Sequence, residues 1–178
     1  MKLSLRRVLT LFAALLFALA TGMTAANAAT DFTNAPSGAH YANGFSEPVC
    51  TVDGVTVTCT NTKIGGVGNT NATVVLTVSN KITGVCHNPG NYNVVDPFTK
   101  TVTTSTEPLE IKPGRNGQLV VPTRTLSGTS SADFRATFSC PNPRWTAEVT
   151  SNVLTYTYTL TFDGFTDPAI LITGQVTL

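Results

Sequence analysis

The sequence predicts an all-β fold of about seven to nine short antiparallel strands. Three observations lead to this prediction. Threonine and valine dominate residues 47–178, and both favour a pleated, half-buried surface over a helix. Apolar residues alternate with polar ones in several segments, which is the period of a strand. Turn-forming residues separate these segments at intervals of roughly 8–12 residues, a spacing typical of a sandwich or a barrel.

Residues 1–28 have the layout of a secretory signal peptide. A short basic region precedes an apolar run over residues 8–20, and Ala26-Asn27-Ala28 resembles the small-residue site that signal peptidase cleaves. The apolar run is shorter than the roughly 20 residues of a spanning helix, which disfavours the alternative of a retained membrane anchor. We therefore expect cleavage after residue 28, a secreted, extracellular location and no membrane insertion of the mature chain.

The remaining 150 of the 178 residues suit a single domain. Residues 29–46 are small and polar without a sustained period, so we expect a flexible N-terminal lead-in before a β-sandwich domain over residues 47–178. Three of the 11 basic residues leave with the signal, so eight face ten acids, a formal balance of −2. This balance predicts no nucleic-acid partner, because such partners require clustered Lys and Arg.

The strand pattern is clearest in NVLTYTYTLTF (152–162), which places apolar and aromatic residues on one face and threonine on the other. The segment CTVDGVTVTC (50–59) predicts a hairpin, because Asp53-Gly54 is a turn signal between two alternating runs. In DFRATFSC (133–140), alternation predicts a strand that ends at Pro141, since proline lacks the donor for a ladder. The other predicted strands are 72–80, 117–122 and 169–178, with 99–104 and 108–112 as weaker candidates.

Four cysteines follow the signal segment: Cys50, Cys59, Cys86 and Cys140. An even number in an exported chain predicts disulfide bonds, and four cysteines allow three pairings. The hairpin pattern favours Cys50 with Cys59, which leaves Cys86 with Cys140. Zinc is disfavoured because there is no Cys-x-x-Cys pair, and we expect no cofactor.

The register of the first bridge raises one difficulty. A strict two-residue turn at Asp53-Gly54 would place Cys50 opposite Val57. The Cys50–Cys59 bridge would then require a wider turn or a bulge.

Four segments together resemble a known group of proteins: CTVDGVTVTC, PLEIKPGRNGQLVVP, FSCPNPRWTAEV and YTYTLTFDGF. They are similar to small exported immunoglobulin-like β-sandwich proteins of high-GC Gram-positive bacteria, which have no assigned activity. The resemblance covers most of residues 47–178 and implies a single immunoglobulin-like β-sandwich. It transfers no catalytic residue. The antibody-type tryptophan between two bridging cysteines is absent, because Trp145 follows Cys140.

Trp145, the only tryptophan, has two interpretations. Its ring could close one end of the core beside a disulfide, as large aromatic residues commonly do. Alternatively, it could be exposed on a loop platform and stack on a sugar ring. Trp145 is therefore the candidate binding residue, and both interpretations stay open at this point.

Candidate chemical groups are few. A Cys86–His87 nucleophile pair is disfavoured, because strand neighbours point to opposite faces and an oxidised cysteine offers no thiolate. Asp163 and Asp167 in FDGFTDP are weak calcium candidates, since short Asp-Gly turns are common without a metal. We therefore expect no catalytic residue and no firm metal site.

These observations predict a secreted, non-enzymatic module with a binding or structural role at the cell envelope or outside the cell. Its expected partner is a glycan or other polymer, contacted through loops and an aromatic surface. One alternative is a protein-binding factor such as an inhibitor or matrix subunit, which would use a sheet edge or the loops. The other is a hydrolase whose site has no recognisable motif.

Overall fold

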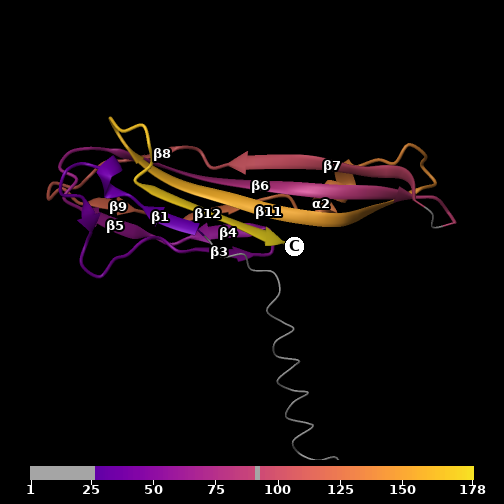
Figure 1. Cartoon of the computed structure of the whole chain (residues 1–178), viewed down its shortest axis with the longest axis horizontal. Helices are drawn as coiled ribbons and strands as arrows, with labels where there is room; N and C mark the ends of the chain where they lie inside the picture. Colours follow the sequence, from indigo (N-terminus) through magenta and orange to yellow (C-terminus); the bar gives the residue numbers. More distant parts are fainter. Residues whose placement is uncertain (1–26, 91–92) are drawn as a thin grey trace, which may run out of the picture.

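The computed structural model describes residues 27–90 and 93–178, and its side chains are described outside residues 91–99 (Figure 1). Antiparallel strands dominate this part of the chain, with one α-helix among the described residues. The prediction of an all-β protein is therefore confirmed. The predicted signal peptide lies outside the described residues except for Asn27 and Ala28, which begin the first strand.

One large sheet forms the long layer of the molecule (Figure 1). Its strands lie in the order β1 (Asn27–Thr30), β12 (Ile170–Thr177), β11 (Thr146–Phe162), β6 (Ala72–His87) and β7 (Asn93–Ser105), and β8 (Leu109–Ile111) also pairs with β6. The central strands β6 and β11 have 16 and 17 residues and pair from Ala72↔Phe162 to His87↔Thr146. The strands predicted at 72–80, 152–162 and 169–178 are confirmed, and the first two are longer than expected.

Two small sheets complete the β structure of the described part of the chain. One contains β10 (Arg124–Ser127), β4 (Thr56–Cys59) and β3 (Cys50–Asp53), and the other contains β2 (His40–Tyr41), β5 (Thr62–Gly65) and β9 (Leu119–Val121). Within residues 27–90 and 93–178, the helical elements are the 3₁₀ helix η1 (Phe32–Asn34) and the α-helix α2 (Ser131–Thr137).

The hydrophobic core joins the large sheet to both small sheets. Alternate residues of β6 and β11, such as Leu76 and Leu160, are fully buried, while the threonines between them are mostly part-exposed. The same cluster includes Val57 of β4, Ile64 of β5 and Leu119 of β9. One face of the long sheet therefore supplies the core for both small sheets.

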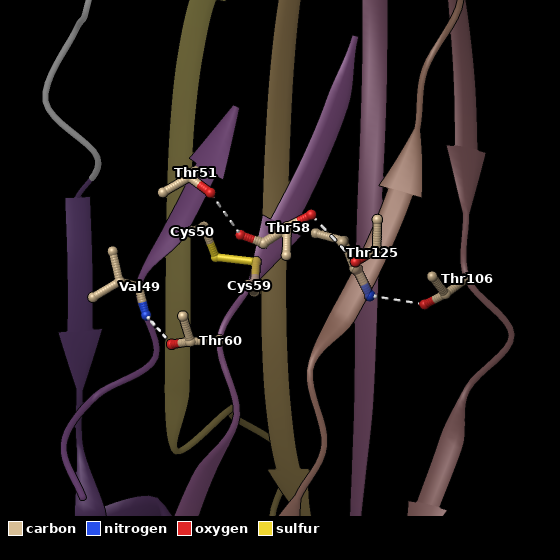
Figure 2. The surroundings of a disulfide bond; sticks show 9 residues. Val49, Cys50, Thr51, Thr58, Cys59, Thr60, Thr106 and Thr125 are labelled. Carbon is tan, nitrogen blue, oxygen red and sulfur yellow. Dashed lines mark hydrogen bonds between the residues drawn. A yellow bond between two sulfur atoms is a disulfide. The ribbon is translucent and has the colours of Figure 1, made fainter. Parts of the chain in front are cut away.

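The β3–β4 hairpin has a different turn from the predicted one. Gly54 and Val55 form the two-residue turn, and Gly54 adopts the left-handed φ of 54° that favours glycine. Moving the turn by one residue places Cys50 directly opposite Cys59, with 3.9 Å between their Cα atoms. The predicted bridge is present (Figure 2), and neither a wider turn nor a bulge is needed.

The predicted strand at 133–140 is wrong, because residues 131–137 form α2. Ser130 caps this helix, and its Oγ accepts a hydrogen bond of 3.0 Å from the backbone N–H of Asp133. Phe134 and Phe138 are four residues apart, a spacing that puts them on one face of either a strand or a helix. The cap decides between these two structures in favour of the helix.

Residues 29–46, expected to be a flexible lead-in, contain half of β1 and all of η1 and β2. Ala35 and Ala42 are buried, and the rings of Phe32 and Tyr41 meet edge to face with centroids 5.2 Å apart. The hydroxyl of Tyr41 bonds to Thr30 at 2.6 Å. This segment is therefore packed against the domain.

A buried polar network joins the centre of the long sheet to the start of α2. The Asn80 side-chain amide donates to Asn152 Oδ1 at 2.9 Å, and both residues are almost fully buried. Asn80 Oδ1 accepts from the backbone N–H of Thr129, while the Asn152 amide donates to the Thr129 carbonyl. These bonds fix the chain between β10 and α2 against the sheet.

We expect Gly128→Ala to destabilise the protein by about 1–3 kcal/mol, because overpacking in a filled interior forces neighbours to shift. A Cβ atom at Gly128 would overlap Asn80 Oδ1 and come within 2.9 Å of Val78 Cγ1. Urea unfolding measures the change. Gly114→Ala is the control, since its Cβ would make only ordinary contacts from 3.4 Å outward. Equal stability of the two variants would contradict the packing described.

Tyr158 makes the stability of the protein sensitive to alkaline pH. It is fully buried, and its hydroxyl has no hydrogen-bond partner among the described residues. Burial raises the pKa of Tyr158 well above its ordinary value of 10.0, Tyr41 raises it further, and Arg124 lowers it. Because the pKa of Tyr158 is raised in the folded state, burial of its protonated hydroxyl leaves the stability of the protein unaffected by pH below pH 10. Stability is lost as the pH rises above this value, because the unfolded chain then ionises more readily than the folded one.

We expect Tyr158→Phe to retain wild-type stability at pH 7, because it removes a hydroxyl without a partner. The variant should lose less stability than wild type between pH 9 and about pH 11. Urea unfolding midpoints at the three pH values test this. Parallel losses in both proteins would show that Tyr158 does not contribute.

Candidate functional site

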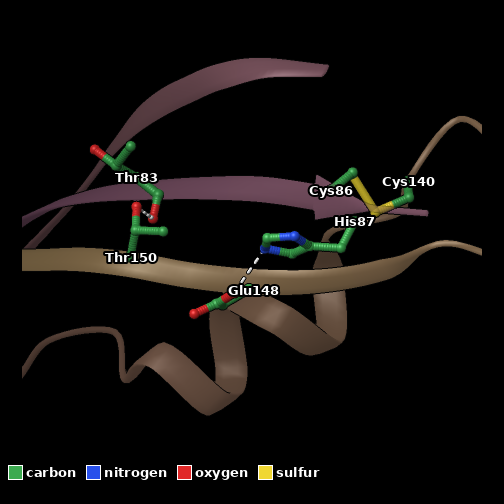
Figure 3. Close-up of polar contacts among 6 residues, drawn as sticks. All are labelled: Thr83, Cys86, His87, Cys140, Glu148 and Thr150. Carbon is green, nitrogen blue, oxygen red and sulfur yellow. Dashed lines mark hydrogen bonds and ion pairs between the residues drawn. A yellow bond between two sulfur atoms is a disulfide. The ribbon is translucent and has the colours of Figure 1, made fainter. Parts of the chain in front are cut away.

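The candidate site lies where β6 ends and β11 begins, beside α2. His87 is the last residue of β6 and pairs with Thr146, the first residue of β11. The β6–β11 register shifts between Val149 and Ser151, close to this end of the sheet. Figure 3 shows His87, Glu148 and the Cys86–Cys140 disulfide together at this end.

A hollow of about 380 Å³ opens between the strand ends and the helix. We call it the α2 hollow. Its lining residues are His87, Asn88, Pro89, Arg135, Thr146, Ala147 and Glu148. They come from the end of β6 and the turn after it, from α2 and from the start of β11, so three chain segments must fold together to form the hollow.

His87 and Glu148 form the polar contact in this hollow. The two residues are diagonal neighbours across β6 and β11, on the same face of the sheet, and His87 Nε2 lies 2.7 Å from Glu148 Oε2 (Figure 3). The His87 side chain is 17% exposed and that of Glu148 is 58% exposed. The contact therefore holds a largely buried imidazole against a carboxylate that water still reaches.

The Cys86–Cys140 disulfide attaches the loop after α2 to the end of β6. Cys86 is buried, and its Cα lies 5.9 Å from that of Cys140. The predicted pairing of these cysteines is confirmed. Cys140 lies in a loop, however, and does not end a strand as expected, because α2 replaces that strand.

Trp145 directly precedes β11 and is half-buried. Its backbone N–H donates to the Asn142 carbonyl at 3.0 Å, and Asn142 Oδ1 accepts from the Arg144 N–H at 2.9 Å. Pro141 and Pro143 flank Asn142, so the segment turns sharply before β11 starts. The turn places Trp145 one residue before Thr146, which lines the α2 hollow.

The calcium candidates lie in a different part of the fold. Asp163 and Asp167 are both exposed in the connection between β11 and β12. The backbone N–H of Asp163 donates to the Asn71 carbonyl at 2.9 Å, which anchors this turn to the start of β6. Among the described residues, no group of three or more His, Cys, Asp or Glu residues could hold a metal ion.

A second hollow of about 380 Å³ lies along β11 and β12 at the start of β1. Its lining is neutral: Asn27, Thr155, Tyr156, Thr157, Thr173, Gly174 and Gln175. Tyr156 lies over Gly174, its neighbour on β12, where a Cβ atom would overlap the tyrosine ring. This hollow contains no charged residue, which distinguishes it from the α2 hollow.

Sequence reasoning identified Trp145, Cys86, Cys140 and His87 in this region but missed Arg135 and Glu148. Arg135 was assigned to a strand, and Glu148 is one of ten acids with no motif around it. No spacing in the sequence connects these two residues to His87. Only the pairing of β6 with β11, together with α2, places all three around the α2 hollow.

Comparisons with protein-family models, with curated proteins and with solved structures found no match. Among the described residues, the helices are too short or too polar to cross a membrane. The two disulfides indicate an oxidising, non-cytosolic environment. The function of the α2 hollow is therefore inferred from its own residues and their geometry.

We expect loss of the Cys86–Cys140 bridge, in the double variant Cys86→Ser with Cys140→Ser, to destabilise the protein by about 4 kcal/mol. The bridge closes a loop of 54 residues, and chain entropy grows with loop length. The matched variant, Cys50→Ser with Cys59→Ser, opens a loop of nine residues and should cost about 2.5–3 kcal/mol. Urea unfolding measures both, and a larger loss from the short bridge would contradict this order.

Proposed function

We propose that the protein is an exported, non-enzymatic module that binds a glycan or another polymer at the cell envelope or outside the cell. Binding takes place at the end of the molecule that carries the α2 hollow and Trp145. The fold that presents this end is proposed to be an immunoglobulin-like β-sandwich.

The layered packing supports the sandwich assignment. The inward face of the long sheet and both small sheets contribute to one hydrophobic cluster, so the core lies between layers of antiparallel strands. The Cys50–Cys59 bridge lies in a small sheet, whereas Cys86–Cys140 joins the long sheet to a loop. In this arrangement the loops gather at the ends of the long strands, where binding residues are commonly found.

The observation that carries the proposal is the position of Trp145 in the chain, immediately before Thr146 of the α2 hollow. Glycan sites combine an aromatic surface with a few convergent hydrogen-bonding groups. Trp145 is partly exposed, and the adjoining hollow offers an imidazole, a guanidinium, a carboxylate and a hydroxyl. These groups can donate to and accept from sugar hydroxyls while the indole covers a sugar ring.

The state of the cysteines supports binding without catalysis. Cys86 and Cys140 are joined in a disulfide, so neither offers a thiolate beside His87. His87 contacts Glu148, which orients the imidazole at the wall of the hollow. In this proposal, the pair positions a ligand and does not activate a nucleophile.

Affinity electrophoresis and pull-down on cell-wall and polysaccharide preparations test the proposal. We expect Trp145→Ala to weaken binding by about 10-fold, because the stacking surface is lost. Trp145→Phe is the matched control and should retain most of the affinity. Unchanged thermal unfolding confirms that both variants fold.

Two results would overturn the proposal. Wild-type protein that binds no polymer but recovers a protein partner would favour the alternative of an inhibitor or matrix subunit. Equal polymer binding by wild type and Trp145→Ala would show that the polymer is bound elsewhere.

A further inference from the structure

We propose that the α2 hollow recognises an anionic group on its polymer, a carboxylate or a phosphate, and that Arg135 is the residue that binds it. This inference rests on the proposed function and specifies the ligand class. It starts from the charges that surround the hollow.

The three ionisable residues of the hollow differ in how they are paired. Glu148 Oε2 lies 2.7 Å from His87 Nε2, so this acid already has a polar partner. Among the described residues, the guanidinium of Arg135 forms no ion pair. Its N–H donors therefore remain available for a ligand in the hollow.

The chemistry of a guanidinium favours an oxyanion. Its planar fork of donors matches the two oxygens of a carboxylate or of a phosphate and binds them through parallel hydrogen bonds. Thr146 adds a hydroxyl donor, and the side-chain amide of Asn88 lies in the same lining. Asn88 Oδ1 accepts a hydrogen bond of 3.0 Å from the Gly90 N–H, which holds this side chain against its own turn.

Arg135 projects from a helical turn that is anchored on several sides. Ser130 caps the helix, and the neighbouring residue Phe134 is only 3% exposed. The rings of Phe134 and Phe138 stack with centroids 6.2 Å apart, and Cys140 is bonded to β6 shortly afterwards. A guanidinium carried by a fixed backbone loses less freedom on binding than one on a mobile loop.

Arg144 provides a matched control. It is exposed in the turn before Trp145, close along the chain to the same end of the molecule, but it does not line the hollow. Arg135→Gln and Arg144→Gln remove the same charge, so a general electrostatic attraction would weaken equally in both variants. Binding in the hollow would weaken only in the first.

The probes are polygalacturonate as the carboxylate polymer, polyglycerol phosphate as the phosphate polymer and dextran as the neutral polymer. We expect wild type to bind at least one acidic polymer more tightly than dextran. Arg135→Gln should weaken that binding by about 10- to 100-fold, as expected for loss of a bidentate charged contact. Arg144→Gln should bind like wild type.

Each outcome decides the inference. A loss confined to polygalacturonate or to polyglycerol phosphate supports it and identifies the anionic group. Equal affinity of wild type and Arg135→Gln, or equal losses in the two arginine variants, would overturn it. If Trp145→Ala loses binding while Arg135→Gln does not, the anionic specificity fails and the proposed function stands. If wild type binds none of the three probes or the wall preparations, the proposed function fails as well.

Discussion

The pairing of β6 with β11 is the constraint on which the rest of the structure depends. Sixteen residues of one strand and seventeen of the other run antiparallel from Ala72↔Phe162 to His87↔Thr146. Because side chains alternate between faces, the pair gives one apolar face to the core and one threonine-rich face to the outside. Its far end extends beyond the small sheets toward α2 (Figure 1), and that end forms most of the candidate site.

A hydrogen-bond network and a disulfide hold α2 and its loop against this strand pair. The Asn80–Asn152 network fixes the chain before the helix, and the Cys86–Cys140 bridge fixes the chain after it. The network and the disulfide both involve residues of β6 or β11. The position of α2, and with it that of Arg135, therefore depends on the register of these two strands. The proposed site is therefore attached to the most regular part of the fold, although its lining includes a helix and loops.

The sequence predicted the elements with local signals and missed those that depend on long-range contacts. Apolar and aromatic residues alternate with threonine from Leu154 to Phe162. This pattern indicated a strand, because successive residues of a strand point to opposite faces. Phe134 and Phe138 are compatible with either a strand or a helix, because a spacing of four residues fits both periods, and the Ser130 cap favours the helix. The site was only partly predicted: Trp145 and the cysteines are rare residues that draw attention, whereas Arg135 and Glu148 are ordinary surface residues until folding brings them beside His87.

Backbone amide NMR of the wild-type protein during titration with a bound polymer tests the central claim most directly. The account predicts shift changes in His87, Arg135 and Glu148 and in the indole of Trp145, the residues in and next to the α2 hollow. Changes centred instead on Thr157 and Thr173, in the neutral hollow along β11 and β12, would contradict it.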